Sequence, residues 1–313
     1  MLKIFNKFKK SYRSNYFWAV CISILIILLV LRESWFCDDA FFTFRSAMNL
    51  HYGFGPVWNT GERIQNYTNI LWMFLVSLSN AQNIYIWTLT LSISFVLSTL
   101  IFIVYLGKLS ANYIFLTLAL LLLCFSWVYI DFGTSGLETP MSGFFVASTF
   151  LLTRLLKKSI SLGIYFRGFW VGLSFLSRPD LIIITFLDSI LVLFENKKSK
   201  TLINFSKFTF SALIIFIIWS FFSLIYYGFP FPITAYTKLS TGLDRSEIII
   251  KGIGYLINFS FADITGAFLL FIAFILPLFS ISKSNPKKIR ISNSFINFLI
   301  KFRSSIVIFI ATS

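Results

Sequence analysis

Long apolar stretches separated by short basic segments constrain this chain more than any other feature. Stretches at 17–31, 84–106, 113–130 and 208–227 approach or reach the ~20 residues that a helix needs to cross a bilayer. Charged residues make up only 12% of the chain, against about 25% in soluble globular domains. So few charges cannot cover a surface that faces water. The sequence therefore predicts an all-α protein that crosses a membrane several times.

The positive charges indicate how the chain is oriented. The net charge is +15, and the Lys and Arg residues cluster at 3–13, 154–167, 197–207 and 283–303, between apolar stretches. Loops with such a bias normally stay in the cytoplasm, so we expect a cytoplasmic N-terminus. These loops lack the aromatic residues in a polar context that a nucleic-acid groove would need. The expected partner of the surface is the lipid bilayer, with no nucleic acid.

This charge bias predicts about nine spans in a single transmembrane domain, residues 1–313. The expected spans are 16–32, 83–106, 110–129, 139–155, 162–177, 181–195, 207–227, 262–282 and 294–313. A long outer loop, 33–82, follows the first span. Within this loop we expect an amphipathic helix at 39–51. We also expect a helix at 67–79 that is too short to cross and lies at the outer face.

Four polar clusters lie beside span ends on the predicted outer side. They are Asp38-Asp39, Gly136-Leu137-Glu138-Thr139-Pro140, Arg178-Pro179-Asp180, and residues 230–238 with Lys238. Each has a structural alternative: Asp38 as a helix N-cap, Arg178 with Asp180 as an ion pair, Lys238 reaching for the interface. Charges near a bilayer are costly, so the set is a functional-site hypothesis.

These clusters carry a likeness to a known family. The matching residues are Asp38-Asp39-Ala40-Phe41-Phe42-Thr43-Phe44-Arg45, Asn49-Leu50, Gly53-Phe54-Gly55, Val57-Trp58-Asn59, Gly61-Glu62, Tyr67-Thr68-Asn69-Ile70-Leu71-Trp72, Gly136-Leu137-Glu138-Thr139-Pro140, Ser177-Arg178-Pro179-Asp180, and Tyr226-Tyr227-Gly228 through Lys238. In this order they resemble the GT-C-type membrane glycosyltransferases of the mycobacterial terminal β-(1→2)-arabinofuranosyltransferase family.

The resemblance implies a GT-C-like fold and the transfer of a sugar from a polyprenyl-phosphate donor. The sugar would be a pentose such as arabinofuranose, or another sugar, and the acceptor a hydroxyl of a glycan, lipid or protein. The site would lie on the outer, periplasmic face of the inner (cytoplasmic) membrane, because nucleotide sugars stay in the cytoplasm. No cofactor is certain; a divalent cation stays open.

The resemblance implicates Asp38 and Asp39 as the catalytic pair. A general base for the acceptor hydroxyl is required, and an Asp at a helix start stays ionised there. Adjacent helical residues point about 100° apart, so the two acids have different roles. We lean towards Asp38 as the base, because we expect it just ahead of the helix.

Cations and polar side chains complete the predicted site. Arg178 and Lys238 are candidates for the donor phosphate. Arg45 could join them, with an ion pair to Asp39 or Glu62 as the alternative.

The predicted substrate-binding residues are Glu138, Asp180, Tyr67, Asn69 and Trp58. For Glu138 the alternatives are a helix-start charge and a metal ligand, and for Trp58 an interface anchor.

Two other functions stay open. One is a transporter or flippase of lipid-linked sugars, although no internal duplication is visible. The other is a non-catalytic partner related to a transferase. The chain stops inside its last apolar stretch, which predicts a shortened member of a longer family.

Overall fold

Every regular element of the described residues is a helix, which confirms the all-α prediction for them. The computed structural model describes residues 2–110, 113–156, 160–195, 201–239, 242, 244–268 and 271. The helices are α1 (Leu2–Arg32), α2 (Asp38–His51), α3 (Ile70–Val76), α4 (Ile84–Ser110), α5 (Tyr113–Phe125), α6 (Trp127–Asp131), α7 (Thr139–Leu155), α8 (Ile160–Ser177), α9 (Leu181–Glu195), α10 (Thr201–Tyr227), α11 (Ile233–Leu239) and α12 (Arg245–Ala262).

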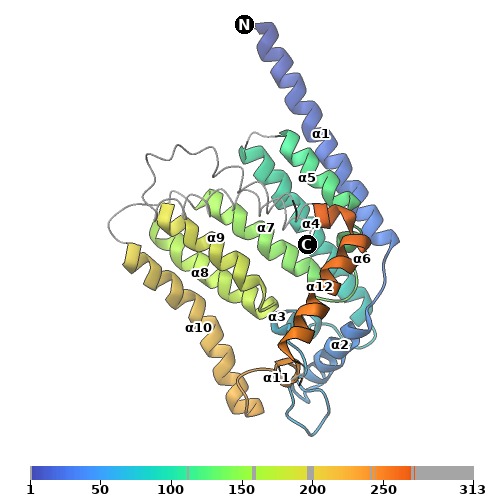
Figure 1. Cartoon of the computed structure of the whole chain (residues 1–313), viewed down its shortest axis with the longest axis vertical. Helices are drawn as coiled ribbons and strands as arrows, with labels where there is room; N and C mark the ends of the chain where they lie inside the picture. The colour runs from blue at the N-terminus through green and yellow to red at the C-terminus, as the bar shows by residue number, and fades with distance from the viewer. Residues whose placement is uncertain are drawn as a thin grey trace.

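The long helices form a bundle, and the short helices α2, α3 and α11 gather at one end of it (Figure 1). Apolar side chains of α1, α4 and α5 share one core, with Ile26, Leu100 and Leu120 fully buried. A second core joins α2, α3 and α7 around Trp72 and Met141. Residues of the segment 33–82 are therefore folded against the end of the bundle.

Several helix bounds agree with the apolar pattern. α7 and α9 begin and end at the residues expected for two spans, 139–155 and 181–195. The span expected at 110–129 is instead divided, because Ser126 interrupts it and its hydroxyl accepts a hydrogen bond from the backbone N–H of Tyr129 at 3.3 Å. Such a cap ends one helix and starts another.

The turn between α8 and α9 carries the Arg178-Pro179-Asp180 cluster. Pro179 cannot donate a backbone hydrogen bond, so a helix tends to end just before it. α8 indeed ends at Ser177 and α9 begins at Leu181. The turn lies near α3, at the same end of the bundle as α2 (Figure 1).

The segment 228–262, expected to be an outer connection, contains two helices, α11 and α12. Residues 264–268 are helical too. The remainder of the spans expected at 262–282 and 294–313 lies outside the described residues.

Two helical segments of the described residues, Ile84–Leu109 and Leu202–Tyr227, are long and apolar enough to cross a membrane. Shorter apolar helices lie at Tyr16–Arg32, Leu116–Phe125 and Leu181–Ile190. The expected number of nine spans is therefore not established and stays a prediction.

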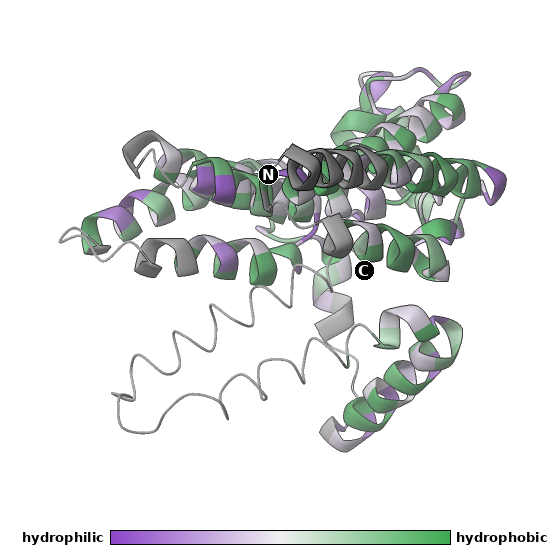
Figure 2. Cartoon of the chain, turned by 90° about the horizontal axis from the view of Figure 1, so that it is seen from above, coloured by the Kyte–Doolittle hydropathy of each residue, from purple (hydrophilic) through white to green (hydrophobic). Residues whose placement is uncertain are grey.

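Hydrophobic residues cover most of the described helices (Figure 2). On α10, Phe210, Ile218, Phe221 and Ile225 are 64–66% exposed. An apolar surface of this kind normally faces lipid or another protein.

Candidate functional site

The start of α2 is fixed against the loop that leads into α7. The backbone N–H of Cys37 donates to the carbonyl oxygen of Ser135 at 2.8 Å, and the indole of Trp72 donates to the carbonyl oxygen of Gly136 at 2.9 Å. Gly136 has φ +80°, and a Cβ there would lie 2.8 Å from atoms of Ala40 and Phe36. Only glycine fits this backbone and this contact. Two of the predicted clusters are thus held side by side.

A chain of polar contacts joins α2 to the turn between α8 and α9. The amide nitrogen of Asn69 donates to the Thr43 hydroxyl at 3.1 Å and to Glu138 Oε2 at 2.8 Å. On its other side, Glu138 Oε1 lies 3.7 Å from Nε of Arg178. Arg178 donates two hydrogen bonds to Asp180, from Nε at 3.1 Å and from Nη2 at 3.0 Å. Thr43, Asn69, Glu138, Arg178 and Asp180 therefore form one continuous network.

The network runs from the interior to the surface. The side chain of Glu138 is 14% exposed, that of Arg178 38% and that of Asp180 60%. Burial lowers the pKa of Arg178, but the hydrogen bond to Asp180 and the charges of Asp180 and Glu138 outweigh it and raise the pKa. Arg178 therefore stays cationic, next to solvent. Its exposed position suits a residue that meets an anion.

The two acids at the start of α2 lie on different faces of the helix. Residues four and seven positions apart share a helix face. Asp39 shares a face with Thr43 and Ser46, whose hydroxyls contact Asn69 and Asn66. The face of Asp39 is thus that of the polar network.

Asp38 shares a face with Phe42 and Arg45 instead. The ring of Phe42 stacks on Trp58 at 5.1 Å, and the Arg45 guanidinium lies 4.3 Å from the centre of the same indole. Arg45 also donates to Asn59 Oδ1 at 2.7 Å, and Asn59 in turn donates to Glu62. Arg45 and Trp58 therefore form a second cluster, on the Asp38 face, and Arg45 reaches Glu62 through Asn59.

The two carboxylates also differ in their hydrogen bonds. Cys37, not Asp38, occupies the N-cap position of α2. The Asp38 carboxylate accepts from the Cys37 thiol at 3.1 Å and from the backbone N–H of Asp39 at 2.9 Å. These two hydrogen bonds, the thiol's first, lower the pKa of Asp38. Both acids are exposed, and within the described residues the Asp39 carboxylate accepts no hydrogen bond.

Tyr67 is buried and connects the outer loop to α10. Its hydroxyl lies 2.9 Å from the hydroxyl of Tyr227, which donates to the carbonyl oxygen of Pro56 at 2.6 Å. Only 3% of Tyr67 is exposed, and burial raises its pKa. The structure thus places Tyr67 inside the fold, in contrast to the exposed Asp39 and Asp180.

Gln65 is a connecting residue that no motif indicated. Its carbonyl oxygen accepts from the backbone N–H of Ile233, the first residue of α11, at 3.2 Å, and its side chain accepts from Ser223 of α10. Gln65 is 2% exposed. This contact brings the fourth polar cluster to the same end of the bundle. Lys238 belongs to α11, but its side chain lies outside the described part.

Thr43 is the other site residue that the motif analysis did not single out. Its position gave a signal, because Thr43 lies one turn after Asp39 on the same helix face. Gln65 gave none, because the residues around it follow no helical period.

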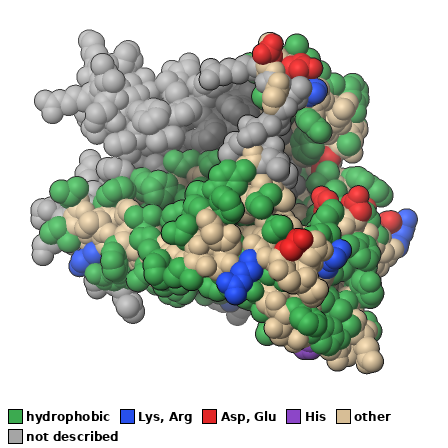
Figure 3. Space-filling view, turned by 90° about the horizontal axis from the view of Figure 1, so that it is seen from below, with side chains coloured by type: hydrophobic (Ala, Val, Ile, Leu, Met, Phe, Trp, Pro, Cys, Tyr) green, Lys and Arg blue, Asp and Glu red, His purple; other side chains and the backbone are tan. Residues whose placement is uncertain are grey.

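Acidic and basic side chains gather among apolar ones on this end of the molecule (Figure 3). In the part of the chain that the structure describes, no group of three or more His, Cys, Asp or Glu residues could hold a metal ion.

In its sequence, the chain that folds into this bundle is similar to a class of glycosyltransferases. Terminal β-(1→2)-arabinofuranosyltransferase of Corynebacterium glutamicum is 28% identical over 235 residues, which are 66% of this chain and 33% of that protein. The protein of the same name from Mycobacterium tuberculosis is 27% identical over 251 residues, 73% of this chain and 38% of that protein. These matches confirm the resemblance to this family.

The chain spans about a third of the length of these curated relatives. No protein-family model matches it, and no solved structure matches it. The GT-C architecture therefore stays a prediction.

Proposed function

We propose that this protein is a polytopic membrane glycosyltransferase, with about nine spans and a GT-C-like fold, that takes a sugar from a polyprenyl-phosphate donor. The transfer takes place on the outer face of the cytoplasmic membrane, to a hydroxyl of a glycan, lipid or protein. The observation that carries the proposal is the polar network from Thr43 to Asp180, beside the two exposed acids of α2. Two relatives named as arabinofuranosyltransferases support an arabinofuranose or a similar sugar.

Asp39 is the general base in this proposal. Its carboxylate lies on the helix face of the Thr43–Asn69 contact and accepts no hydrogen bond from the described residues. It is therefore ready to take the proton of the acceptor hydroxyl as that oxygen bonds to the anomeric carbon. Asp38, whose pKa is lowered by two hydrogen bonds, orients the start of α2. This division differs from the sequence-based preference for Asp38, which assumed that Asp38 precedes the helix.

Arg178 stabilises the leaving group. As the bond between the anomeric carbon and the phosphate oxygen breaks, negative charge grows on the lipid phosphate. A cation preorganised beside that charge lowers the barrier. Asp180 and Glu138 hold the guanidinium in place, and its 38% exposed side chain can meet a phosphate. Lys238 is proposed as a second cation.

The variants Asp38→Asn and Asp39→Asn test the proposal. Asn keeps the size of Asp but cannot accept the proton, so Asp39→Asn should lower transfer by about 10²- to 10⁴-fold. Asp38→Asn should lower it much less. The assay incubates membranes that contain each variant with radiolabelled polyprenyl-phosphate sugars and measures the sugar transferred. Protein levels and thermal unfolding should match those of the wild type.

The outcomes separate three conclusions. Loss confined to Asp38→Asn would reverse the roles of the two acids. Wild-type transfer by both variants would exclude either acid as the base. A wild-type protein that consumes none of the labelled donors would overturn the enzymatic proposal and favour a transporter or a non-catalytic partner.

A further inference from the structure

A groove outside the candidate site runs between α1 and α4. Its volume is about 290 Å³, and its walls are mostly aliphatic side chains such as Val20, Ile24, Leu97 and Ile101. These four side chains are 38–55% exposed, so the groove is open along its side. α5 packs against both helices.

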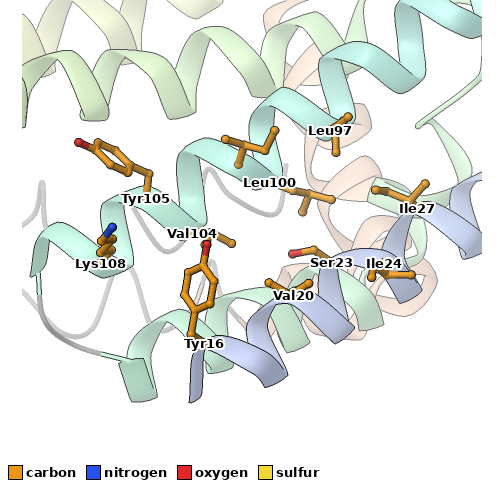
Figure 4. Close-up of a pocket in the computed structure, with 11 residues that line it drawn as sticks. Tyr16, Val20, Ser23, Ile24, Ile27, Leu97, Leu100, Val104, Tyr105 and Lys108 are labelled. Atoms are coloured by element: carbon orange, nitrogen blue, oxygen red, sulfur yellow. The ribbon is translucent and has the colours of Figure 1, made fainter. Parts of the chain in front are cut away.

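The charged and phenolic residues of the groove lie at one end of it. Lys108, Tyr16 and Tyr105 lie at that end, and Ile27 and Leu97 lie at the other (Figure 4). Lys108 is exposed. Gly107, next to it, allows close packing on α5, since a Cβ there would lie 2.7 Å from Leu116. Lys108 therefore lies on a helix that packs closely on α5, at one end of the apolar groove.

The length of the groove matches one leaflet of a bilayer. The lining residues extend from Tyr16 to Ile27 on α1 and from Leu97 to Lys108 on α4. Eleven helical steps of 1.5 Å give about 16 Å. Half of the ~30 Å hydrocarbon core is about 15 Å. An acyl chain of one leaflet would fill the groove while its headgroup stayed at the level of Lys108.

The charge at the polar end points to the headgroup. In the sequence, the basic segment 3–13 precedes Tyr16, which lies at the same end of the groove as Lys108 (Figure 4). Basic residues beside the cytoplasmic leaflet attract anionic lipids. In the proposed orientation both the start of α1 and the end of α4 lie on the cytoplasmic side, opposite to the Asp39 end.

We propose that the α1–α4 groove binds an anionic phospholipid of the cytoplasmic leaflet. Lys108 and the hydroxyls of Tyr16 and Tyr105 hold its phosphate, and the acyl chain lies along the aliphatic walls. This lipid is distinct from the sugar donor, whose phosphate is placed at Arg178 on the opposite face. The inference does not depend on transferase activity.

Native mass spectrometry of the purified full chain tests this site. Delipidated protein is titrated with dioleoyl phosphatidylglycerol, and in a second arm with dioleoyl phosphatidylcholine. Lys108→Gln should lower phosphatidylglycerol binding about fivefold, as expected for one cation at the membrane surface. Lys207→Gln, on α10, is the matched control and should bind like the wild type. Ile101→Trp fills the groove and should lower binding of both lipids, whereas Ile218→Trp on exposed α10 should not.

Equal lipid binding by Lys108→Gln and Lys207→Gln, together with equal binding by the two tryptophan variants, would overturn the proposal. A wild-type protein that binds no lipid would overturn it too. In that case a second copy or another segment of the chain covers the groove, and Ile101→Trp would change the oligomeric state or the thermal unfolding instead. A loss of transfer without a loss of lipid binding would concern only the proposed function.

Discussion

At the scale of single residues, the side chain of Arg178 is oriented by the acidic side chains beside it. Two hydrogen bonds from the guanidinium to Asp180 restrict its rotation, and Glu138 lies behind it at 3.7 Å. The exposed pair with Asp180 alone would contribute little to stability, because solvent screens it. The pair with Asp180 therefore orients the guanidinium of Arg178 and adds little to the stability of the fold.

Substitution of Arg178 should reduce transfer without unfolding the protein. Loss of one charge-assisted hydrogen bond costs about 1.5–3 kcal/mol, so Arg178→Ala should raise the donor KM or lower turnover about tenfold to a hundredfold. Arg178→Lys should restore only part of the activity, because Lys lacks the fork geometry. Steady-state kinetics with the labelled donor measure both variants.

Arg32 offers the matched control for this prediction. Its side chain is 75% exposed and pairs only with the neighbouring Glu33 among the described residues, so Arg32→Ala should leave the kinetics unchanged. A failure of Arg178→Ala to accumulate would instead identify Arg178 as a packing residue.

At the scale of elements, two glycines decide how closely α8 and α10 approach. A Cβ at Gly168 would lie 2.3 Å from the backbone oxygen of Phe208, and one at Gly172 would lie 2.8 Å from that of Ala212. Glycines four residues apart let helix backbones pack closely within a membrane. The side chain of Ser211, also close to Gly168, could rotate away, but the two backbone oxygens could not, so a side-chain rotation cannot relieve the contact.

Gly168→Ala should therefore destabilise the protein by about 1–3 kcal/mol, as overpacking does. Thermal unfolding in detergent, followed by circular dichroism, measures the change as a lower Tm. Gly252→Ala in α12 is the control, because a Cβ there meets nothing within 4 Å and Ala favours the helix. An unchanged Tm for Gly168→Ala would mean that α8 and α10 do not pack as closely as described.

At the scale of the whole molecule, all four polar clusters lie at one end and the basic loops are predicted at the other. The polar end is assembled by contacts between distant segments, such as Cys37 with Ser135 and Gln65 with Ile233. The polar end of the α1–α4 groove, at Lys108, lies away from this end of the molecule. The proposed transferase site and the proposed lipid site therefore lie at opposite ends of the bundle.

Single-cysteine labelling in intact cells tests the orientation. In a background without the native cysteines, Thr60→Cys should react with a membrane-impermeant maleimide, because residues 33–82 are proposed to lie outside. Lys198→Cys, in a basic segment proposed to be cytoplasmic, should react only after the membrane is opened. Labelling of position 198 from outside would invert the proposed topology and move the site to the cytoplasmic face.

The apolar and basic patterns predicted helix positions well, because a helix in lipid must satisfy its own backbone and needs a long apolar run. The bounds of α7 and α9 agree with the expected apolar stretches, and Pro179 separates α9 from α8. The break at Ser126 and the helix α12 escaped prediction. Ser126 sits inside a long apolar run, and α12 is half polar, so neither changes the average hydropathy enough to mark an end or a start.

Residue type and order by themselves determined which side chains could do the chemistry: two acids, an Arg between Ser177 and Pro179, and Glu138 before Pro140. Only the tertiary structure decided which of these side chains lie together. It joins Thr43, on the Asp39 face of α2, to Asn69 and Glu138, and it sets Arg45, on the Asp38 face, against Trp58. It also buries Tyr67 against Tyr227. The reason is physical: local sequence sets helix faces, but which face meets which partner depends on contacts between residues up to 171 positions apart.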